Sequence, residues 1–496
     1  MKDQLPFPEF KLGLTWFNSP PLTKAFFAGK LVVVDFWTYC CINCLHTLPL
    51  LKKLEKKYHN KPVFFLGIHS AKFPNEKIDE QIKKAIERYT ITHAVVNDPD
   101  LHTWKILGVR AWPTLLLLGP HENCLFMASG EGKIGELDLM IEAALSYYSL
   151  NAIEPAPPFL EKATPSFLSF PGKVAFNAQR RLICIADSGH NRLVLAKFDG
   201  TVVEIIGGDV PGFHDGNFPL AKFRSPQGIA FHENTLYVAD TGNHALRCID
   251  FDQQTVQTIA GIGQQGSDRR GGKIGVKQAL NSPWDVLVIA NCLFIAMAGA
   301  HQIWVYDVLN KIVTNFSGSG QELHLNSEDA LSAAWAQPSG LSLGKNFLYV
   351  ADSESSSIRR IDLTKGSTET VIGGDPQNSS NLFVFGDCEG GKEKALLQHP
   401  LAVLYLESSR ELVIADTYNH RLKKFHLKSG QLKNWVGKGV AGYQDGKKME
   451  ACFDEPSGLA YSKADHCVLV ADTNNHAIRV INCLTNEVTT LPLHAQ

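Results

Sequence analysis

Long apolar runs, net charge and clustered cysteines are all scarce in this sequence of 496 residues. No stretch approaches the ~18 to 20 apolar residues that a membrane-spanning helix needs, so a membrane protein is not expected. The formal net charge is −2, from 48 Lys and Arg against 50 Asp and Glu, which leaves no overall field to attract nucleic acid or an anionic membrane. The 11 cysteines stand apart except at Cys40, Cys41 and Cys44, so a disulfide framework is not expected either.

The first residues, Met1–Pro6, contain neither a continuous apolar segment nor a small-residue cleavage site. A secretory signal is therefore not indicated, and the sequence favours the cytoplasm. What the sequence does contain is two segments of different texture, separated by a proline-rich stretch.

The N-terminal segment, up to about residue 150, alternates apolar strands with amphipathic helices. Residues 31–37 are apolar except for Asp35, as in a buried strand, whereas residues 44–58 place leucines at nearly the helical period. Similar patterns predict strands over 63–68 and 114–118 and helices over 76–89 and 134–148. The order predicts an α/β domain over residues 1–150. Prolines recur through residues 151–170, which we interpret as a linker.

From residue 171 onward, short apolar runs alternate with glycine and aspartate, and one motif recurs. An Ala-Asp turn follows a short apolar run five times, at Asp187, Asp240, Asp352, Asp416 and Asp472, and a sixth, degenerate copy has Met297 in that place. Each copy begins at a proline, with four short strands predicted per copy, as at 228–231, 235–239, 245–250 and 256–260. Repeats of this kind predict a six-bladed β-propeller over 171–496, an all-β unit after the α/β domain. Residues 166–170 are a candidate closing strand that would pair with 488–493.

These turns and the strands that follow them, such as 245–250, resemble NHL repeats. The resemblance implies a propeller that binds protein or RNA in most cases and acts as an enzyme in a few, and the fold alone does not decide between them. The loop 263–275 is basic, but the chain as a whole carries no positive excess, so nucleic acid is not a predicted partner.

The repeated residues of the propeller have a structural explanation. Aspartate accepts backbone N–H bonds in tight turns, so we interpret the five repeated aspartates as turn formers. His244, His420 and His476 are interpreted as packing residues between blades. Function is expected where the repeat breaks, at 297–301, 383–385 and 263–275.

The string Asp35-Phe-Trp-Thr-Tyr-Cys-Cys-Ile-Asn-Cys44 puts Cys41 and Cys44 three residues apart where a strand gives way to a helix. Unpaired N–H groups and the helix dipole favour a thiolate there, which predicts Cys41 as the attacking sulfur. Cys44, one turn further on, can then attack a mixed disulfide formed at Cys41. The alternatives are two buried thiols without chemistry, or three soft metal ligands with Cys40 and no identified fourth ligand.

Two further features resemble the thioredoxin superfamily. Asp35 lies where such folds carry a buried carboxylate, and the resemblance implies that it relays a proton to Cys44. A carboxylate in an apolar strand is costly unless it is used or paired, so the alternative is a purely structural role. Trp112-Pro113-Thr114 precedes a strand and matches the family's cis-proline. The resemblance implies that Pro113 contacts the substrate backbone, with Trp112 as an accessory residue.

The extended N-terminus and the Ile68-His-Ser70 turn resemble the TlpA and DipZ branch of that superfamily, and the whole chain resembles the NHL repeat-containing protein 2 family. Cys40 takes the place of the usual aromatic residue before the first cysteine, and either adds a thiol or fills space as a small hydrophobe. His46 and His69 lie near the motif, and we interpret both as hydrogen-bonded structural residues.

The sequence thus favours a thiol-disulfide oxidoreductase whose site contains Cys41, Cys44, Asp35 and Pro113, with a propeller that binds or orients a client. It predicts a protein client or redox partner, no cofactor, no metal, and neither nucleic acid nor membrane as a partner. The rival hypothesis is a scaffold in which a redox-silent thioredoxin fold and the propeller both bind proteins. A metal-dependent propeller enzyme is the third, and turns already account for the acidic residues that it would need.

Overall fold

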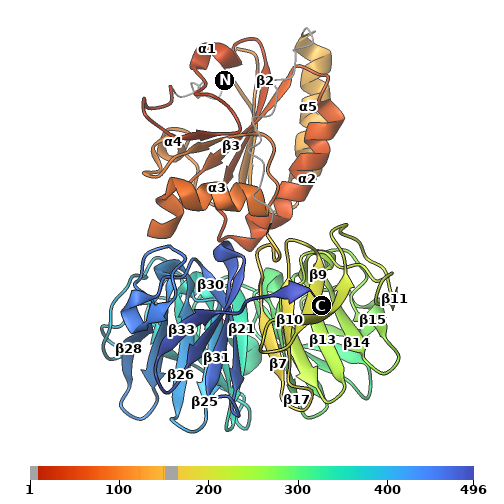
Figure 1. Cartoon of the computed structure of the whole chain (residues 1–496). Helices are drawn as coiled ribbons and strands as arrows, with labels where there is room; N and C mark the ends of the chain where they lie inside the picture. The colour runs from red at the N-terminus through yellow and green to blue at the C-terminus, as the bar shows by residue number, and fades with distance from the viewer. Residues whose placement is uncertain (1–8, 122, 149, 151–165, 496) are drawn as a thin grey trace. The chain divides into compact units, whose positions relative to one another are not determined.

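The computed structural model describes residues 9–121, 123–148, 150 and 166–495. The chain divides into two compact units, Met1–Pro165 and Ser166–Gln496 (Figure 1). Most of the predicted linker, residues 151–165, lies outside the described residues, and the predicted domain boundaries stay predictions. In the described part of the chain, no helix is long and apolar enough to span a lipid bilayer.

The first unit is built on one six-stranded sheet. In sheet order its strands are β1 (Trp16–Phe17), β4 (Ala94–Asn97), β3 (Val63–His69), β2 (Leu31–Trp37), β5 (Thr114–Leu118) and β6 (Cys124–Ser129). The strands β2, β3 and β4 are parallel, and the others run antiparallel to their neighbours. The helices of the described residues are α1 (Lys24–Phe27), α2 (Ile42–Tyr58), α3 (Asp79–Arg88), α4 (His102–Ile106) and α5 (Ile134–Tyr148). The predicted thioredoxin-like fold is confirmed.

Alternation along β2 decides what lies beneath α2. Leu31 and Val33 point to the face that α2 and α5 cover, where they pack with Leu51 of α2 and Ile141 of α5. Figure 1 shows these two helices side by side. Because successive side chains of a strand alternate between faces, Asp35 leaves β2 on the same side as Leu31 and Val33. The carboxylate of this apolar strand therefore lies under the helix that carries the cysteines.

The predicted elements of the first unit match the structure where they are long. The predicted strands 31–37 and 114–118 coincide with β2 and β5, whereas α2 begins at Ile42, two residues earlier than predicted. The predicted helix 76–89 is instead a 3₁₀ turn, Pro74–Lys77, followed by α3. The sequence does not predict β1, β4, β6, α1 or α4, because elements of two to six residues carry too little periodicity.

The second unit consists of six sheets, each built around four antiparallel strands. In chain order the blades are β7 (Val174–Asn177), β8 (Leu182–Asp187), β9 (Arg192–Ala196) and β10 (Thr201–Gly207); β12 (Ile229–His232), β13 (Thr235–Asp240), β14 (Ala245–Asp250) and β15 (Thr255–Ala260); β17 (Pro283–Ile289), β18 (Cys292–Met297), β19 (Gln302–Asp307) and β20 (Ile312–Ser317); β21 (Pro338–Gly344), β22 (Phe347–Asp352), β23 (Ser357–Asp362) and β24 (Thr368–Gly373); β25 (Ala402–Leu406), β26 (Glu411–Asp416), β27 (Arg421–His426) and β28 (Gln431–Val436); β30 (Pro456–Ser462), β31 (Cys467–Asp472), β32 (Ala477–Asn482) and β33 (Glu487–Thr490). Four outer strands are added by β11 (Gly216–Asn217), β16 (Gly271–Ile274), β29 (Gly446–Lys447) and β34 (His494–Ala495). The predicted six-bladed propeller is confirmed.

The recurring aspartate closes its turn by hydrogen bonds and a buried ion pair. The Asp240 carboxylate accepts the N–H of Arg224 at 2.8 Å and pairs with the buried Arg247 at 2.8 Å. The other copies accept a backbone N–H in the same way, at Asp187, Asp352, Asp416 and Asp472. These contacts give the aspartates a structural role in the turns.

The next residues of the motif fasten each blade to the following one. Thr241 Oγ1 donates to the carbonyl oxygen of Pro283, at the entry of the third blade, at 2.6 Å. His244 Nδ1 accepts the N–H of Ser282 at 3.0 Å. His420 and His476 accept N–H groups at the entries of the sixth and first blades. The histidines thus join neighbouring blades.

In the degenerate copy, which forms the third blade, apolar groups replace the buried ion pair. Met297 stands in place of the aspartate, and its Sδ accepts the N–H of Asn281 at 3.4 Å. Seven residues on, where the second blade carries Arg247, Trp304 donates its Nε1–H to Gln302 at 2.9 Å. Because both charged partners are absent together, neither is left buried and unpaired. Packing therefore accounts for the loss of the ion pair at 297–301, and a function at this break stays a prediction.

The ring closes through the first and last blades. Thr473 Oγ1 donates to the carbonyl oxygen of Pro171 at 2.8 Å, and the N–H of Phe170 donates to His476 Nδ1 at 3.1 Å. At the outer edge, β34 pairs in parallel with β10, beside which it lies in Figure 1. The predicted pairing of 166–170 with 488–493 is absent from the described residues. Pro171, which directly follows that segment, lacks an N–H and cannot donate to a ladder.

Candidate redox site

The turn after β2 and the first turn of α2 bring Cys41 and Cys44 together. Cys41 is the N-cap residue of α2, and its carbonyl oxygen accepts the N–H groups of Cys44 at 3.0 Å and Leu45 at 3.1 Å. The two thiols are in hydrogen-bond contact, and no disulfide joins them. Cys44 has no exposed surface, whereas Cys41 retains 9%. The structure therefore has a dithiol here in which Cys41 is the more exposed of the two residues.

Cys44 lies in surroundings that keep it protonated. Burial raises the pKa of the Cys44 thiol well above its usual value, and Cys41 and the Asp35 carboxyl group raise it further. Since the thiolate is the nucleophile in disulfide exchange, Cys44 needs a base close by before it can attack.

Asp35 supplies a carboxyl group on the α2 face of the sheet. The residue is 2% exposed, and neither carboxyl oxygen has a hydrogen-bond partner among the described residues. Burial raises the pKa of Asp35 to about 7, while His93 acts to lower it and Glu55 to raise it. A group with this pKa can take up and release a proton near neutral pH. Its effect on the pKa of Cys44 indicates that the two groups interact.

The loop before β5 contains Trp112 and Pro113, joined by a cis peptide bond. The Trp112 indole N–H donates to the carbonyl oxygen of Ser70 at 2.9 Å, and its ring packs on Trp104 at 4.4 Å between centroids. Pro113 is buried, and its carbonyl oxygen accepts the N–H of Gly130 at 2.8 Å. Pro113 also has no N–H, so its backbone offers no hydrogen-bond donor at this loop.

Cys40 lies in a segment held by a buried carboxylate, Glu76, that the sequence analysis missed. Glu76 Oε1 accepts the Cys40 N–H at 2.9 Å and the Thr38 hydroxyl at 2.6 Å. Its Oε2 accepts the N–H groups of Lys72 at 3.0 Å and Phe73 at 3.1 Å. The Cys40 side chain is buried, with Sγ 3.9 Å from Thr38 Oγ1. A carboxylate outside every motif gives no sequence signal of this role.

Comparison with known proteins shows to which family this chain belongs. Residues 29–124 match the thioredoxin-like family, and residues 223–249 and 453–481 match the NHL repeat. NHL repeat-containing protein 2 of Homo sapiens is 41% identical over 525 residues, which cover 99% of this chain and 72% of that protein. The chain belongs to the NHL repeat-containing protein 2 family.

Other relatives extend the comparison. The protein SUPPRESSOR OF QUENCHING 1, chloroplastic, of Arabidopsis thaliana is 46% identical over 491 residues, which cover 96% of this chain and only 46% of that protein. The thiol-disulfide oxidoreductase ResA of Halalkalibacterium halodurans is 25% identical over 114 residues, 23% of this chain and 60% of ResA. The first unit is therefore related to thiol-disulfide oxidoreductases.

The two histidines near the motif have other contacts in this member of the NHL repeat-containing protein 2 family. His46 Nδ1 lies 2.6 Å from Glu131 Oε1. His69 is fully buried, its ring lies 5.0 Å from that of Trp37 and 5.5 Å from that of Tyr39, and burial lowers its pKa to about 3. Both nitrogens of His69 lack a hydrogen-bond partner among the described residues, so the structure corrects the predicted hydrogen-bonded role to one of packing. No group of three or more His, Cys, Asp or Glu in the described residues is arranged to hold a metal ion.

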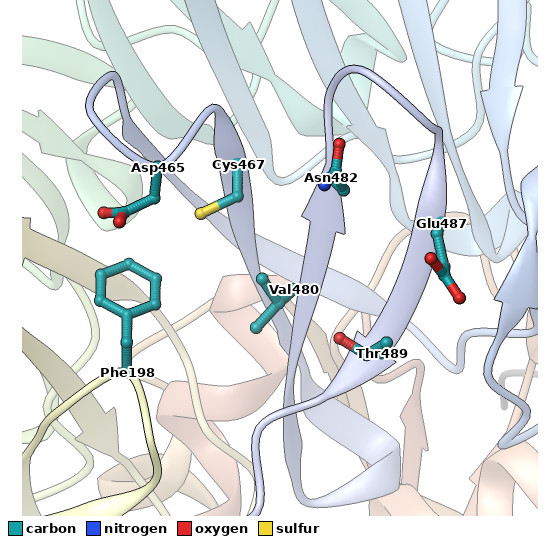
Figure 2. A pocket seen from close by; sticks show the side chains of 7 residues that line it. All are labelled: Phe198, Asp465, Cys467, Val480, Asn482, Glu487 and Thr489. Carbon is teal, nitrogen blue, oxygen red and sulfur yellow. The ribbon is translucent and has the colours of Figure 1, made fainter.

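The propeller has a pocket of about 260 Å³, which Figure 2 shows, lined by Phe198, Asp465, Cys467, Val480, Asn482, Glu487 and Thr489. Burial, together with the nearby Asp465 and Cys483, raises the pKa of Cys467 to about 11. Asp465 is paired with Arg181 at 2.7 Å. The thiol is therefore protonated at neutral pH, and its acidic neighbour already forms an ion pair.

Proposed function

We propose that the first unit is a thiol-disulfide oxidoreductase that acts on protein disulfides, and that the propeller binds or orients the client. The observation that carries the proposal is that the buried, protonated Cys44 interacts with the Asp35 carboxyl group. Burial raises the pKa of that carboxyl group to about 7, and its oxygens have no hydrogen-bond partner among the described residues. The relationship to the protein named thiol-disulfide oxidoreductase ResA supports it. The assignments of Cys41, Cys44, Asp35 and Pro113 remain predictions of this proposal.

In the reducing direction the reaction has two exchange steps. The Cys41 thiolate attacks one sulfur of the client disulfide, forming a Cys41–client disulfide and releasing the other client sulfur as a thiolate. Cys44 then gives its proton to Asp35 and attacks Cys41 Sγ, and the second client sulfur leaves as a thiolate. The client gains two electrons, and the protein ends with a Cys41–Cys44 disulfide. Oxidation of a client is the same sequence reversed.

The cis-proline loop is assigned to peptide positioning. Because the Pro113 carbonyl oxygen already accepts the Gly130 N–H, we assign the backbone contact with the client peptide to the adjacent Trp112 instead of Pro113. The indole of Trp112, held by Ser70 and Trp104, fixes that loop.

The propeller offers apolar side chains for a protein partner. Val210 is 65% exposed and Phe213 41% in the loop after the first blade, and Val440 is 52% and Tyr443 60% exposed in the corresponding loop after the fifth. Exposed aromatic and aliphatic residues of this kind are typical of protein-binding surfaces. The cytoplasm stays the predicted location, whereas the Arabidopsis relative is described as chloroplastic.

The scaffold hypothesis has one observation in its favour: Cys41 exposes only 9% of its surface. A redox-silent thioredoxin fold would need no access to that sulfur. The two functions differ in whether Cys41 forms a covalent intermediate.

Capture of mixed disulfides from cell lysate separates them. Cys44→Ser removes the resolving thiol, so clients are expected to remain attached to Cys41 and to be released by dithiothreitol. Cys41→Ser is the matched control and is expected to retain none. Equal recovery of the same proteins, insensitive to dithiothreitol, with both variants would support the scaffold.

A further inference from the structure

Polar atoms of three residues beneath α2 have no hydrogen-bond partner among the described residues: both carboxyl oxygens of Asp35, Nε2 of His93 and Nε1 of Trp37. The Asp35 residue is 2% exposed, Trp37 is fully buried, and the His93 side chain is 6% exposed. Buried polar groups in native proteins are almost always paired with protein or with ordered water. Several such groups on one face of the sheet therefore call for a common partner.

Gly67 lies beside these groups. Gly67 is the register partner of Asp35 on the neighbouring parallel strand, so a side chain at residue 67 would leave the sheet on the same face as Asp35. A Cβ there would lie 3.0 Å from Trp37 Nε1, 3.1 Å from His93 Nε2 and 3.2 Å from Val95 Cγ2. These contacts are shorter than nearly all real Cβ contacts, so a side chain at residue 67 would crowd both ring nitrogens. The two unpartnered nitrogens thus converge on the side of Gly67 that also carries Asp35.

His93 continues this line of groups toward the surface. Its Nδ1 lies 2.7 Å from Glu55 Oε1, and Glu55 Oε2 accepts the hydroxyl of Thr92 at 3.1 Å. The Glu55 side chain, on α2, is 19% exposed and so reaches solvent. In the tautomer whose Nδ1–H donates to Glu55, Nε2 of His93 is left as an acceptor toward Gly67.

We propose that a water molecule beside Gly67 links Asp35 to His93, and that His93 and Glu55 form with it a proton path between Asp35 and solvent. The inference rests on the proposed function, because it supplies the route by which Asp35 loses, between turnovers, the proton that it takes from Cys44. Trp37 donates its Nε1–H to the water and holds it in place. His93, Glu55 and Trp37 are positioning or relay residues, since none of them contacts the reacting sulfurs in this account.

The proton balance of one reductive turnover follows from this arrangement. Asp35 takes the proton of Cys44 as Cys44 attacks Cys41. The Asp35 carboxylic acid then donates to the water, the water donates to His93 Nε2, and His93 passes its Nδ1 proton to Glu55. Glu55 releases that proton to bulk water. One proton leaves per disulfide formed, and Asp35, the water and Glu55 return to their starting states. His93 is left with its proton on Nε2, and the return of one proton along the same path when the disulfide is reduced again restores the Nδ1–H tautomer.

The ionisable groups that face Asp35 come from three elements. Helix α2 contributes Cys41, Cys44 and Glu55, and the segment before β4 contributes His93. Strand β3 contributes His69, which burial keeps neutral because its pKa is lowered to about 3. The effects of both His93 and Glu55 on the pKa of Asp35 support their electrostatic contact with it. A structural His93–Glu55 pair without water is the alternative that the test must exclude.

The water can be detected without any redox reaction. In the reduced full chain labelled with ¹⁵N-tryptophan, we expect magnetisation transfer from water to the Trp37 indole N–H, identified by its loss in Trp37→Phe. Gly67→Ala puts a methyl group in the same place and is expected to abolish the transfer. Gly135→Ala, on α5 with nothing within 4 Å of its Cβ, is the matched control. No transfer in the wild-type protein would overturn the proposal, whether or not Gly67→Ala folds.

The relay itself is tested by the rate at which Cys44 resolves a preformed mixed disulfide. His93→Gln is expected to slow this step about ten-fold near neutral pH, and imidazole in the buffer is expected to restore the rate. His59→Gln, at an exposed position, should leave it unchanged. An unchanged rate in His93→Gln, or slowing that imidazole does not relieve, contradicts the relay. If the wild-type protein forms no Cys41–Cys44 disulfide, the proposed function fails, and the water signal at Trp37 still decides whether the hydrated path exists.

Discussion

The N–H of Cys44 donates to the carbonyl oxygen of Cys41 at 3.0 Å, so one helical turn holds the two thiols in contact. Only Cys41 retains exposed surface. This asymmetry orders the proposed chemistry: the more exposed sulfur meets the client, and the buried one resolves the intermediate with Asp35 as its base.

Replacing Asp35 with asparagine is expected to stabilise the protein at alkaline pH. Folding raises the pKa of Asp35 from 3.8 to about 7, so the folded state binds this proton more tightly than the unfolded state, and stability falls as pH rises between these values. The shift corresponds to at most about 4 kcal/mol. Urea unfolding should show a gain for Asp35→Asn at about pH 8 and none at about pH 4. An equal effect at both pH values would contradict the assignment.

His69 is expected to make the fold sensitive to acid. Burial lowers its pKa from 6.5 to about 3, so the unfolded state binds the proton more tightly. The stability that the neutral ring preserves above pH 6.5 is therefore lost as pH falls toward 3, by at most about 5 kcal/mol. His69→Phe keeps a ring against Trp37 and removes this loss, which a lower pH midpoint of acid unfolding would reveal. His59→Phe, at an exposed position, should behave like the wild type.

The buried ion pairs of the propeller should be costly to break from one side. Arg359 and Asp352 lie 3.0 Å apart with no exposed side-chain surface, so Arg359→Met leaves the carboxylate stranded and is expected to cost about 3–5 kcal/mol. Adding Asp352→Asn should recover part of the loss, as the apolar third blade suggests. The neighbouring Arg360→Met removes a more exposed pair with Glu369 and a contact over the Phe347 ring, and should cost about 1–2 kcal/mol. Equal losses for the two arginine variants in denaturant unfolding would refute this explanation.

Glu76 is expected to hold the segment before Cys41. In Glu76→Gln, the amide cannot accept the four donors that the carboxylate accepts, so a loss of about 2–3 kcal/mol is expected. Amide hydrogen exchange should accelerate at Cys40 and Phe73. The exposed Glu80→Gln serves as control. Unchanged protection at both amides would mean that the carboxylate does not anchor this segment.

The fold could be predicted from the sequence where the pattern is long or repeated. Seven apolar-rich residues identify β2, and the five aspartate turns with Met297 identify six blades. The short strands of the first unit could not be predicted in this way, nor could the ring closure by β34, which depends on pairing between residues near 201 and 494.

Only part of the candidate site could be predicted from the sequence, for the same physical reason. Cys41, Cys44 and Asp35 lie within ten residues of one another, and the chain direction places them together. Glu76, Gly67 and His93 reach the site only through the pairing of β2 with β3 and of β3 with β4, which no local spacing encodes. The hydrogen bond from the Gly130 N–H to the Pro113 carbonyl oxygen joins residues 17 positions apart and likewise has no signal in the local sequence.

The most direct test of the account is a redox titration of the full chain, with the Cys41–Cys44 disulfide measured by mass spectrometry after thiol labelling. We expect one two-electron couple between about −120 and −300 mV, the range of thiol-disulfide oxidoreductases. The couple should persist in Cys40→Ala and vanish in Cys41→Ser. Absence of a Cys41–Cys44 disulfide at every potential would contradict the central claim.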